Sequence, residues 1–199
     1  MRAPIWQKAM WFLLVLVGAP GQAMAHLVNT GFGPFYDGIV HVLATPEDLL
    51  LIVALTLLAG LRGAPCGRAV LCVLPVAWLA GAVAGGMTGL AVDIPVLSAA
   101  LLIAVGALVA VDLRLSLIWV TALALTCGVL HGYFNGASLA RARVSGLAVV
   151  GIASAVFVLV SLLSGQVTAL RAYWTRIVVR VAGSWLTAIG LLMLGWALR

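Results

Sequence analysis

The chain has 199 residues, of which 65% are hydrophobic and only 8% are charged, and its mean hydropathy is +1.25. A soluble domain carries about a quarter charged residues, so this composition excludes a water-soluble globule. Eleven basic and five acidic residues give a formal net charge of +6. That excess would indicate nucleic-acid binding in a soluble protein, but in a chain this apolar it indicates membrane topology and no nucleic-acid partner.

Residues 1–25 have the pattern of a secretory signal peptide. Basic residues come first, a short apolar core follows, and glycine and proline then break the helix. The core is too short to span a bilayer, and the sequence "AMA" ending at residue 25 fits the small-x-small rule of signal peptidase. We expect cleavage after Ala25 and a mature domain over residues 26–199; an uncleaved signal anchor is the alternative. His26 would then be the first residue, and its α-amine and imidazole together can chelate a transition metal.

Six hydrophobic segments follow, each near the length that spans a bilayer. They cover residues 47–61, 69–86, 95–111, 115–130, 144–163 and 177–198, and the first is extended backwards by the apolar stretch 35–43. Long apolar runs favour helices over the short alternating strands of a barrel. The sequence therefore predicts an all-α fold, a polytopic membrane helix bundle of about six transmembrane helices.

The arginines predict how this bundle is oriented. A cleaved signal places residue 26 outside the cytoplasmic membrane, and the spans then alternate. The inner arginines would be Arg62, Arg68, Arg114, Arg171, Arg176 and Arg180, and the outer ones Arg141, Arg143 and Arg199. This excess agrees with the positive-inside rule. We predict a multi-pass protein of a bacterial inner membrane with the mature N-terminus in the periplasm.

The stretch "AHLVNTGFGPFYDGIVHVLATPEDLLL" collects two of the three histidines and three of the five acidic residues. Asp37 and His41 are four residues apart, so on a helix they share a face. Asp48 lies eleven residues after Asp37 and would return to nearly the same face of a continuous helix. Ionisable groups amid such apolar neighbours are costly unless they are paired or functional, so these residues are candidate ligands.

A second interpretation applies to the middle of this stretch. Thr45 fits an N-cap, Pro46 a first helical position, and Glu47 and Asp48 the acidic first turn of a helix. Both acids would then only cap a span. For the backbone, two alternatives stay open: a continuous helix kinked at Pro46, or a short half-helix followed by a break and the main span. A break would expose helix ends to a ligand.

The third histidine lies in "LHGYFNGASL", at the end of the fourth segment. His131, Asn135 and Ser138 are spaced to share one helical face, and the predicted topology places them at the same outer end as His41. Imidazole with carboxylate and amide oxygens is a ligand set that suits nickel, cobalt, zinc or copper(II) better than magnesium or calcium. No cysteine is placed to help, which argues against a copper(I) site.

Two stretches carry a family resemblance. "GFGPFYDGIVHVLATPEDLLLIVALTLLAGLRG" and "LHGYFNGASL" resemble two motifs of the HupE/UreJ family, small bacterial inner-membrane proteins associated with nickel or cobalt uptake for hydrogenase and urease. The resemblance places the family's functional positions on Asp37, His41, His131 and Gly132. The chain departs from the better-studied branch, in which an Asp-His pair is adjacent and a glutamate stands near the position of Ser138.

The predicted function is a secondary permease for a divalent transition metal, nickel or cobalt, and not an enzyme. The expected metal ligands are His41, Asp37, His131, His26, Glu47, Asp48 and Asn135. The transported ion is the one metal expected, with no tightly bound cofactor; the bilayer is the expected partner, and a homo-oligomer is left open. Two alternatives remain: a non-transporting accessory protein for metalloenzyme maturation, and a membrane metalloenzyme with Glu47 as general base.

Overall fold

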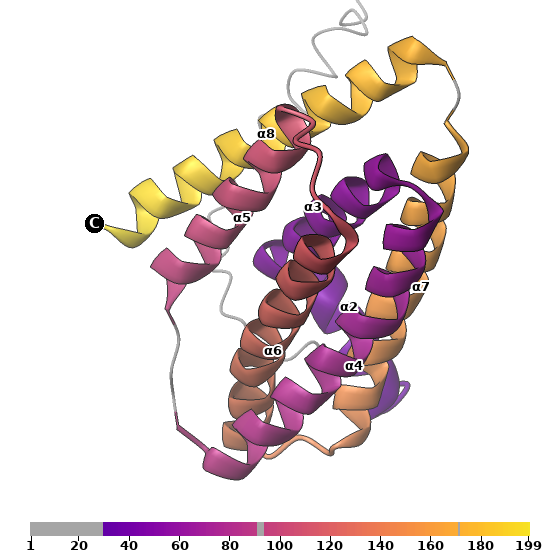
Figure 1. Ribbon diagram of the computed structural model, residues 1–199. Coiled ribbons are helices and arrows are strands. Elements are labelled where there is room, and N and C mark those ends of the chain that lie inside the picture. The colour runs from indigo at the N-terminus through magenta and orange to yellow at the C-terminus, as the bar shows by residue number, and fades with distance from the viewer. Residues whose placement is uncertain (1–29, 91–93, 171) are drawn as a thin grey trace, which may run out of the picture.

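The computed structural model describes residues 30–90, 94–170 and 172–199. Within these ranges the chain forms seven α-helices and no strand (Figure 1). The helices are α2 (Pro34–Ala44), α3 (Pro46–Arg62), α4 (Ala64–Thr88), α5 (Pro95–Ala110), α6 (Leu117–Arg141), α7 (Leu147–Ala169) and α8 (Tyr173–Ala197). The predicted polytopic helix bundle is confirmed. The signal segment and His26 lie outside the described residues, so cleavage after Ala25 stays a prediction.

Each predicted hydrophobic segment corresponds to a helix. Among the described residues, α4, α6, α7 and α8 have 23 to 25 residues and are apolar enough to cross a membrane. The bent pair of α2 and α3 makes a fifth crossing if it is one span. Helix α5 has 16 residues, and a straight helix needs about 20 to cross a bilayer core. Six complete crossings therefore stay a prediction.

The chain breaks between α2 and α3, whose axes differ by 75°. Thr45 is extended, with φ −97° and ψ 99°, and Pro46 begins the new helix. Proline lacks the N–H of a helix interior and disfavours helical geometry in the residue before it, so the break follows from local sequence. Of the two backbone alternatives, the half-helix is the one observed. Thr45 takes the N-cap position, although its side chain makes no capping hydrogen bond.

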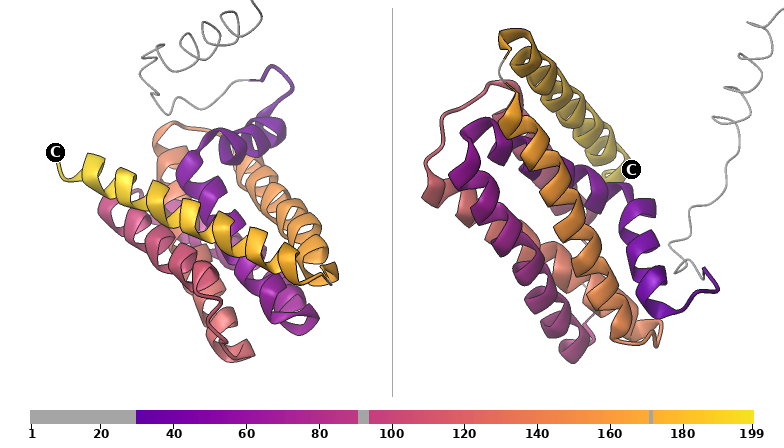
Figure 2. Two further views of the ribbon diagram at one scale, coloured as in Figure 1. Left: turned by 90° about the horizontal axis from the view of Figure 1, so that it is seen from above. Right: turned by 90° about the vertical axis from the view of Figure 1, so that its right-hand side faces the viewer.

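Helix α3 is the centre of the bundle and contacts the six other helices. Its side chains Leu51, Ile52, Leu55 and Leu58 are fully buried. Its main neighbours are α7, α5 and α4, while α4 packs closely on α6 and α5 packs closely on α8 (Figures 1 and 2). The polar side chains at the start of α3 are therefore surrounded by other helices.

Helices α4 and α6 approach until their backbones touch. A Cβ atom added to Gly132 would lie 2.1 Å from the carbonyl oxygen of Trp78, and one added to Gly136 would lie 1.9 Å from that of Ala82. Glycine is needed at such points because any side chain would separate the helices. This contact fixes α6, and with it the position of His131 beside Gly132.

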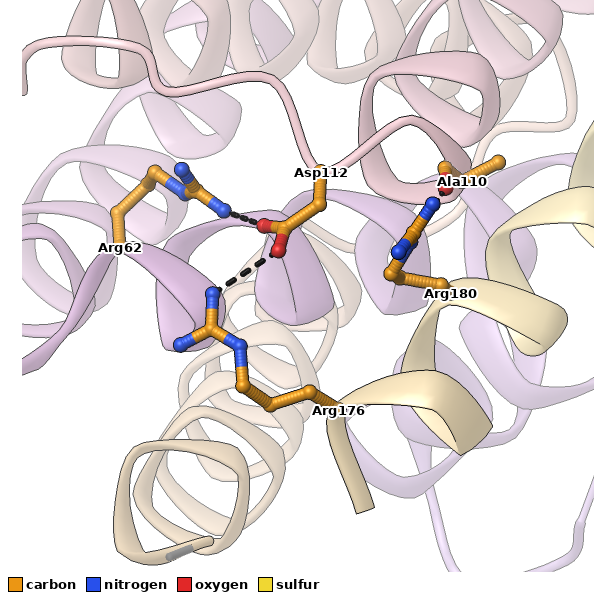
Figure 3. Close-up of polar contacts among 5 residues, drawn as sticks. All are labelled: Arg62, Ala110, Asp112, Arg176 and Arg180. Carbon is orange, nitrogen blue, oxygen red and sulfur yellow. Dashed lines mark hydrogen bonds and ion pairs between the residues drawn. The ribbon is translucent and has the colours of Figure 1, made fainter. Parts of the chain in front are cut away.

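One end of the bundle is tied together by arginines (Figure 3). The Asp112 carboxylate, in the turn after α5, accepts hydrogen bonds from Arg62 at the end of α3 and from Arg176 of α8, the latter at 3.0 Å. The Arg180 side chain donates to the Ala110 carbonyl at 2.9 Å. These contacts place the end of α3, the α5–α6 turn and the start of α8 at the same end, as the predicted alternation requires. The compartment that this end faces stays a prediction.

Candidate functional site

A cavity of about 130 Å³ lies where the break between α2 and α3 meets the start of α5 and the second half of α6. It gathers polar groups from four helices and the break itself. The lining residues are His41, Thr45, Glu47, Asp48, Ser98, His131, Phe134, Asn135, Ser138 and Arg141. This is the end of the bundle that the sequence predicts to face outward.

The helix break positions two of the key side chains. His41 lies in the last turn of α2 and Asp48 in the first turn of α3. The 75° bend between these helices brings both residues against α6, where His131 and Asn135 stand one helical turn apart. All four side chains are buried, with exposed fractions of 9%, 4%, 2% and 7%, respectively.

The four side chains form one continuous hydrogen-bonded network. The His41 Nε2 atom lies 2.9 Å from Asn135 Oδ1, and the Asn135 Nδ2 atom donates to Asp48 Oδ2 at 2.8 Å. The other carboxylate oxygen, Asp48 Oδ1, lies 2.8 Å from His131 Nδ1. The network joins residues 94 and 83 positions apart in the chain, so only the folded bundle can assemble it.

The Asp48 carboxylate sets the direction of every hydrogen bond in this network. A carboxylate only accepts, so His131 Nδ1 must carry a proton and Asn135 must turn its NH₂ group toward Asp48. The Asn135 carbonyl oxygen then faces His41 and requires a proton on Nε2 of that ring. When each imidazole is neutral, its second nitrogen keeps a lone pair: Nδ1 of His41 and Nε2 of His131. A lone pair on imidazole nitrogen is what a transition metal binds.

Two buried polar atoms beside the network have no hydrogen-bond partner among the described residues. They are Nε2 of His131 and Nε1 of Trp78. The centroids of these two rings lie 5.7 Å apart, and the centroid of the Phe134 ring lies 6.1 Å from that of His131. A buried polar atom without a partner costs roughly 1–3 kcal/mol, so a ligand that bonds to His131 Nε2 would remove that cost.

One of the predicted ligands bonds elsewhere, and two others are not assigned to the network. Asp37 lies elsewhere on α2, where its carboxylate accepts hydrogen bonds from the Thr30 backbone N–H and hydroxyl, both at 2.7 Å. Helical periodicity places Asp37 and Asp48 on one face only if the helix is continuous. The bend between α2 and α3 breaks that common face. Glu47 lines the cavity beside Asp48. His26 lies outside the described residues.

Asp48 is no mere cap, because it is buried and pairs with two residues of α6. Sequence reasoning missed Ser98, Phe134 and Arg141 as neighbours of the site. Ser98 belongs to a separate helix and carries no spacing signal relative to the motifs. Within the described ranges, no three His, Cys, Asp or Glu side chains already surround one point as metal ligands would.

The model of one known protein family, described as "HupE / UreJ protein", matches residues 14–193 of the chain. The chain belongs to the HupE/UreJ family. Membership of the HupE/UreJ family indicates a membrane protein related to nickel or cobalt. The family is one of transporters or accessory proteins and is not a known class of enzymes. No match was found among functionally curated proteins or among solved structures.

The HupE/UreJ motif positions have different physical roles in the structure. His41 and His131 lie in the buried network, and Asp37 does not. Gly132 contributes through packing, because α4 can approach α6 only where α6 has no side chain. Asp48, from the first motif, and Asn135, from the second, bridge the two histidines.

Proposed function

We propose that this HupE/UreJ protein is a secondary permease for a divalent transition metal, nickel or cobalt, that binds at the His41–Asn135–Asp48–His131 network. The observation that carries the proposal is a buried network of two imidazoles and one carboxylate at a helix break inside an otherwise apolar bundle. Broken helices are where membrane transporters place their substrate sites, because irregular backbone is tolerated only around a cavity.

The electrostatics of the network favour a cation. The Asp48 carboxylate is 4% exposed, and a buried charge is costly unless it is paired. The His131 imidazole and the Asn135 amide stabilise it by hydrogen bonds, but when the ring is neutral neither group brings an opposite charge. A divalent cation would supply that charge, and imidazole with carboxylate oxygen is a donor set that prefers nickel, cobalt, copper(II) and zinc to magnesium or calcium.

Asn135 is the side chain that must move for metal to enter. Its amide occupies the space between His41 Nε2 and Asp48 Oδ2, at 2.9 and 2.8 Å. In the proposed binding step this amide turns away and the His41 ring changes tautomer, with its proton on Nδ1 instead of Nε2, so that Nε2 and the freed carboxylate oxygen face the ion. Asn135 thus pairs the facing groups of His41 and Asp48 with each other when no metal is bound, which avoids leaving those two groups unpaired in the membrane interior.

Few polar groups lie on the way to the opposite end. Thr56 is fully buried, but its hydroxyl donates to the Ile52 carbonyl at 2.5 Å. At that end Asp112 is held by Arg62 and Arg176. This shortage of ligands favours a second candidate function, in which the protein binds metal without transport and serves metalloenzyme maturation as an accessory protein.

Transport by the purified protein in sealed vesicles distinguishes the two functions. We expect nickel or cobalt to accumulate inside vesicles that contain the wild type and to remain outside with the His41→Ala/His131→Ala double variant. Uptake should decrease as the external pH is lowered, because protons compete with metal for imidazole nitrogen. Metal bound to the protein with no ion delivered inside would contradict the permease and leave the accessory role.

The orientation of the chain gives a further expected result. We propose that both ends of the mature protein face the periplasm of a bacterial inner membrane, since six crossings are even in number and arginines accumulate at the opposite end. Alkaline phosphatase fused after Arg199 should be active, and green fluorescent protein at the same position should be dark. The reverse pattern would mean an odd number of crossings. Helix α5, with 16 residues, would then be the first candidate for a helix that does not cross the membrane.

A further inference from the structure

We propose that the arginine-rich end of this protein binds the phosphate of an anionic glycerophospholipid, such as phosphatidylglycerol, in a groove between α4 and α7. The groove has a volume of about 330 Å³ and lies between the first two turns of α4 and the last turns of α7. It is remote in sequence and in position from the metal-site cavity, and the lipid site does not depend on metal binding.

The charge at this end is unbalanced. Five described arginines gather here with one acidic residue, Asp112; they are Arg62, Arg68, Arg114, Arg176 and Arg180. Asp112 pairs with Arg62 and Arg176, and the Arg180 side chain donates a hydrogen bond to the Ala110 carbonyl (Figure 3). Arg68 lines the groove, is exposed, and makes no hydrogen bond or ion pair to any residue in the described ranges. It is therefore available to a phosphate.

Hydroxyl groups face the same groove. Ser164 is buried, with an exposed fraction of 6%. Neither Ser164 nor Thr168 makes a side-chain hydrogen bond to any residue that the structure describes. A Cβ atom added to Gly67 would lie 3.5 Å from the Ser164 hydroxyl and 3.7 Å from that of Thr168. The bare backbone of Gly67 thus leaves both hydroxyls accessible as donors to a phosphate oxygen.

The rest of the groove matches the body of a lipid. Ala64 and Ala169 stand at the helix ends, and Leu71 lies about two turns beyond Ala64 along α4. A ligand there would meet a cation and hydroxyls at headgroup level and apolar side chains below. The start of α4 and the end of α7 carry opposite partial charges that offset one another. The net attraction for an anion therefore comes from the charge of Arg68, and replacing this one residue tests the proposal.

Basic pockets between transmembrane helices are a known way of binding anionic lipid headgroups. An arginine contact with phosphate is charge-assisted and stronger than a neutral hydrogen bond. A zwitterionic phosphatidylcholine has the same phosphate but no net charge, so the groove should prefer phosphatidylglycerol. Free phosphate lacks the acyl chains that would lie against Leu71 and should bind far more weakly.

Native mass spectrometry of the full chain in detergent, with added phosphatidylglycerol or phosphatidylcholine, tests the proposal. We expect the wild type to retain phosphatidylglycerol in preference to phosphatidylcholine. Arg68→Gln should weaken retention about five- to tenfold, and Arg68→Lys should restore part of it. Arg143→Gln, at the opposite end of the bundle, is the matched control and should behave as the wild type. The Ser164→Ala/Thr168→Val double variant keeps the charge and should weaken retention by a smaller factor.

Four outcomes would overturn the proposal. Equal retention of both lipids by the wild type would show that the groove does not select an anion. Unchanged phosphatidylglycerol retention by Arg68→Gln would place the lipid elsewhere. Arg68-dependent binding of inorganic phosphate without lipid retention would assign the site to a soluble anion. The same spectra count protein copies, and an oligomer that dissociates in Arg68→Gln would mean that a second copy occupies the groove.

Discussion

Replacing Asp48 with Asn should weaken nickel or cobalt binding by about 10- to 100-fold, the usual cost of losing a carboxylate that orients or ligates at a metal site. The substitution keeps the shape of the side chain and removes its charge. In the wild type, His131 Nδ1–H and the Asn135 amide N–H donate to the two carboxylate oxygens. The NH₂ group that the substitution introduces must therefore face one of these two donors. Calorimetric titration of the purified protein in detergent measures the change.

Asp37→Asn is the matched control for this experiment. It removes a carboxylate from the same stretch, but this one is bonded to Thr30 outside the network. Nickel affinity should remain within about twofold of the wild type, because surface substitutions away from special features have small effects. The reverse result, with loss on Asp37→Asn and none on Asp48→Asn, would remove the proposed site. His41→Ala and His131→Ala should each cost more than either acid variant, since each deletes an imidazole.

Gly132→Ala should destabilise the bundle by about 3 kcal/mol or more, at the upper end of the cost of overpacking a well-packed interior. The added Cβ would lie 2.1 Å from the Trp78 carbonyl oxygen, and the contact is with backbone, which has no rotamer to change. Helix α6 must then move away from α4. That movement shifts His131 relative to Asp48, so metal binding should fall together with thermal stability in detergent.

Gly195→Ala, in the last turns of α8, controls for the general effect of replacing a helical glycine. An added Cβ at Gly195 meets no atom within 4 Å. Alanine is a better helix former than glycine, so this variant should be neutral or stabilised by up to about 1 kcal/mol. Equal melting temperatures for Gly132→Ala and Gly195→Ala would contradict the proposed backbone contact between α4 and α6.

Local physical chemistry determines much of this protein directly from its sequence. The apolar composition excludes a soluble fold, and the long hydrophobic runs define the helices of the bundle. The break before α3 follows from Pro46, which cannot donate a hydrogen bond and constrains Thr45. His131, Asn135 and Ser138 line one cavity because they share a face of a single unbroken helix. Each of these features depends only on residues a few positions apart.

The identity of the acid in the candidate site was decided by tertiary structure alone. Spacing gives Asp37 and Asp48 the same helical face only if the helix is continuous, and the 75° bend at Thr45 makes that face discontinuous. Asp48 then meets His131 and Asn135, more than 80 residues away, whereas Asp37 bonds to nearby Thr30. Sequence periodicity describes one helix at a time. The contacts that join α2, α3 and α6 depend on how closely helix backbones can pack, and glycines such as Gly132 set that distance only once the bundle has formed.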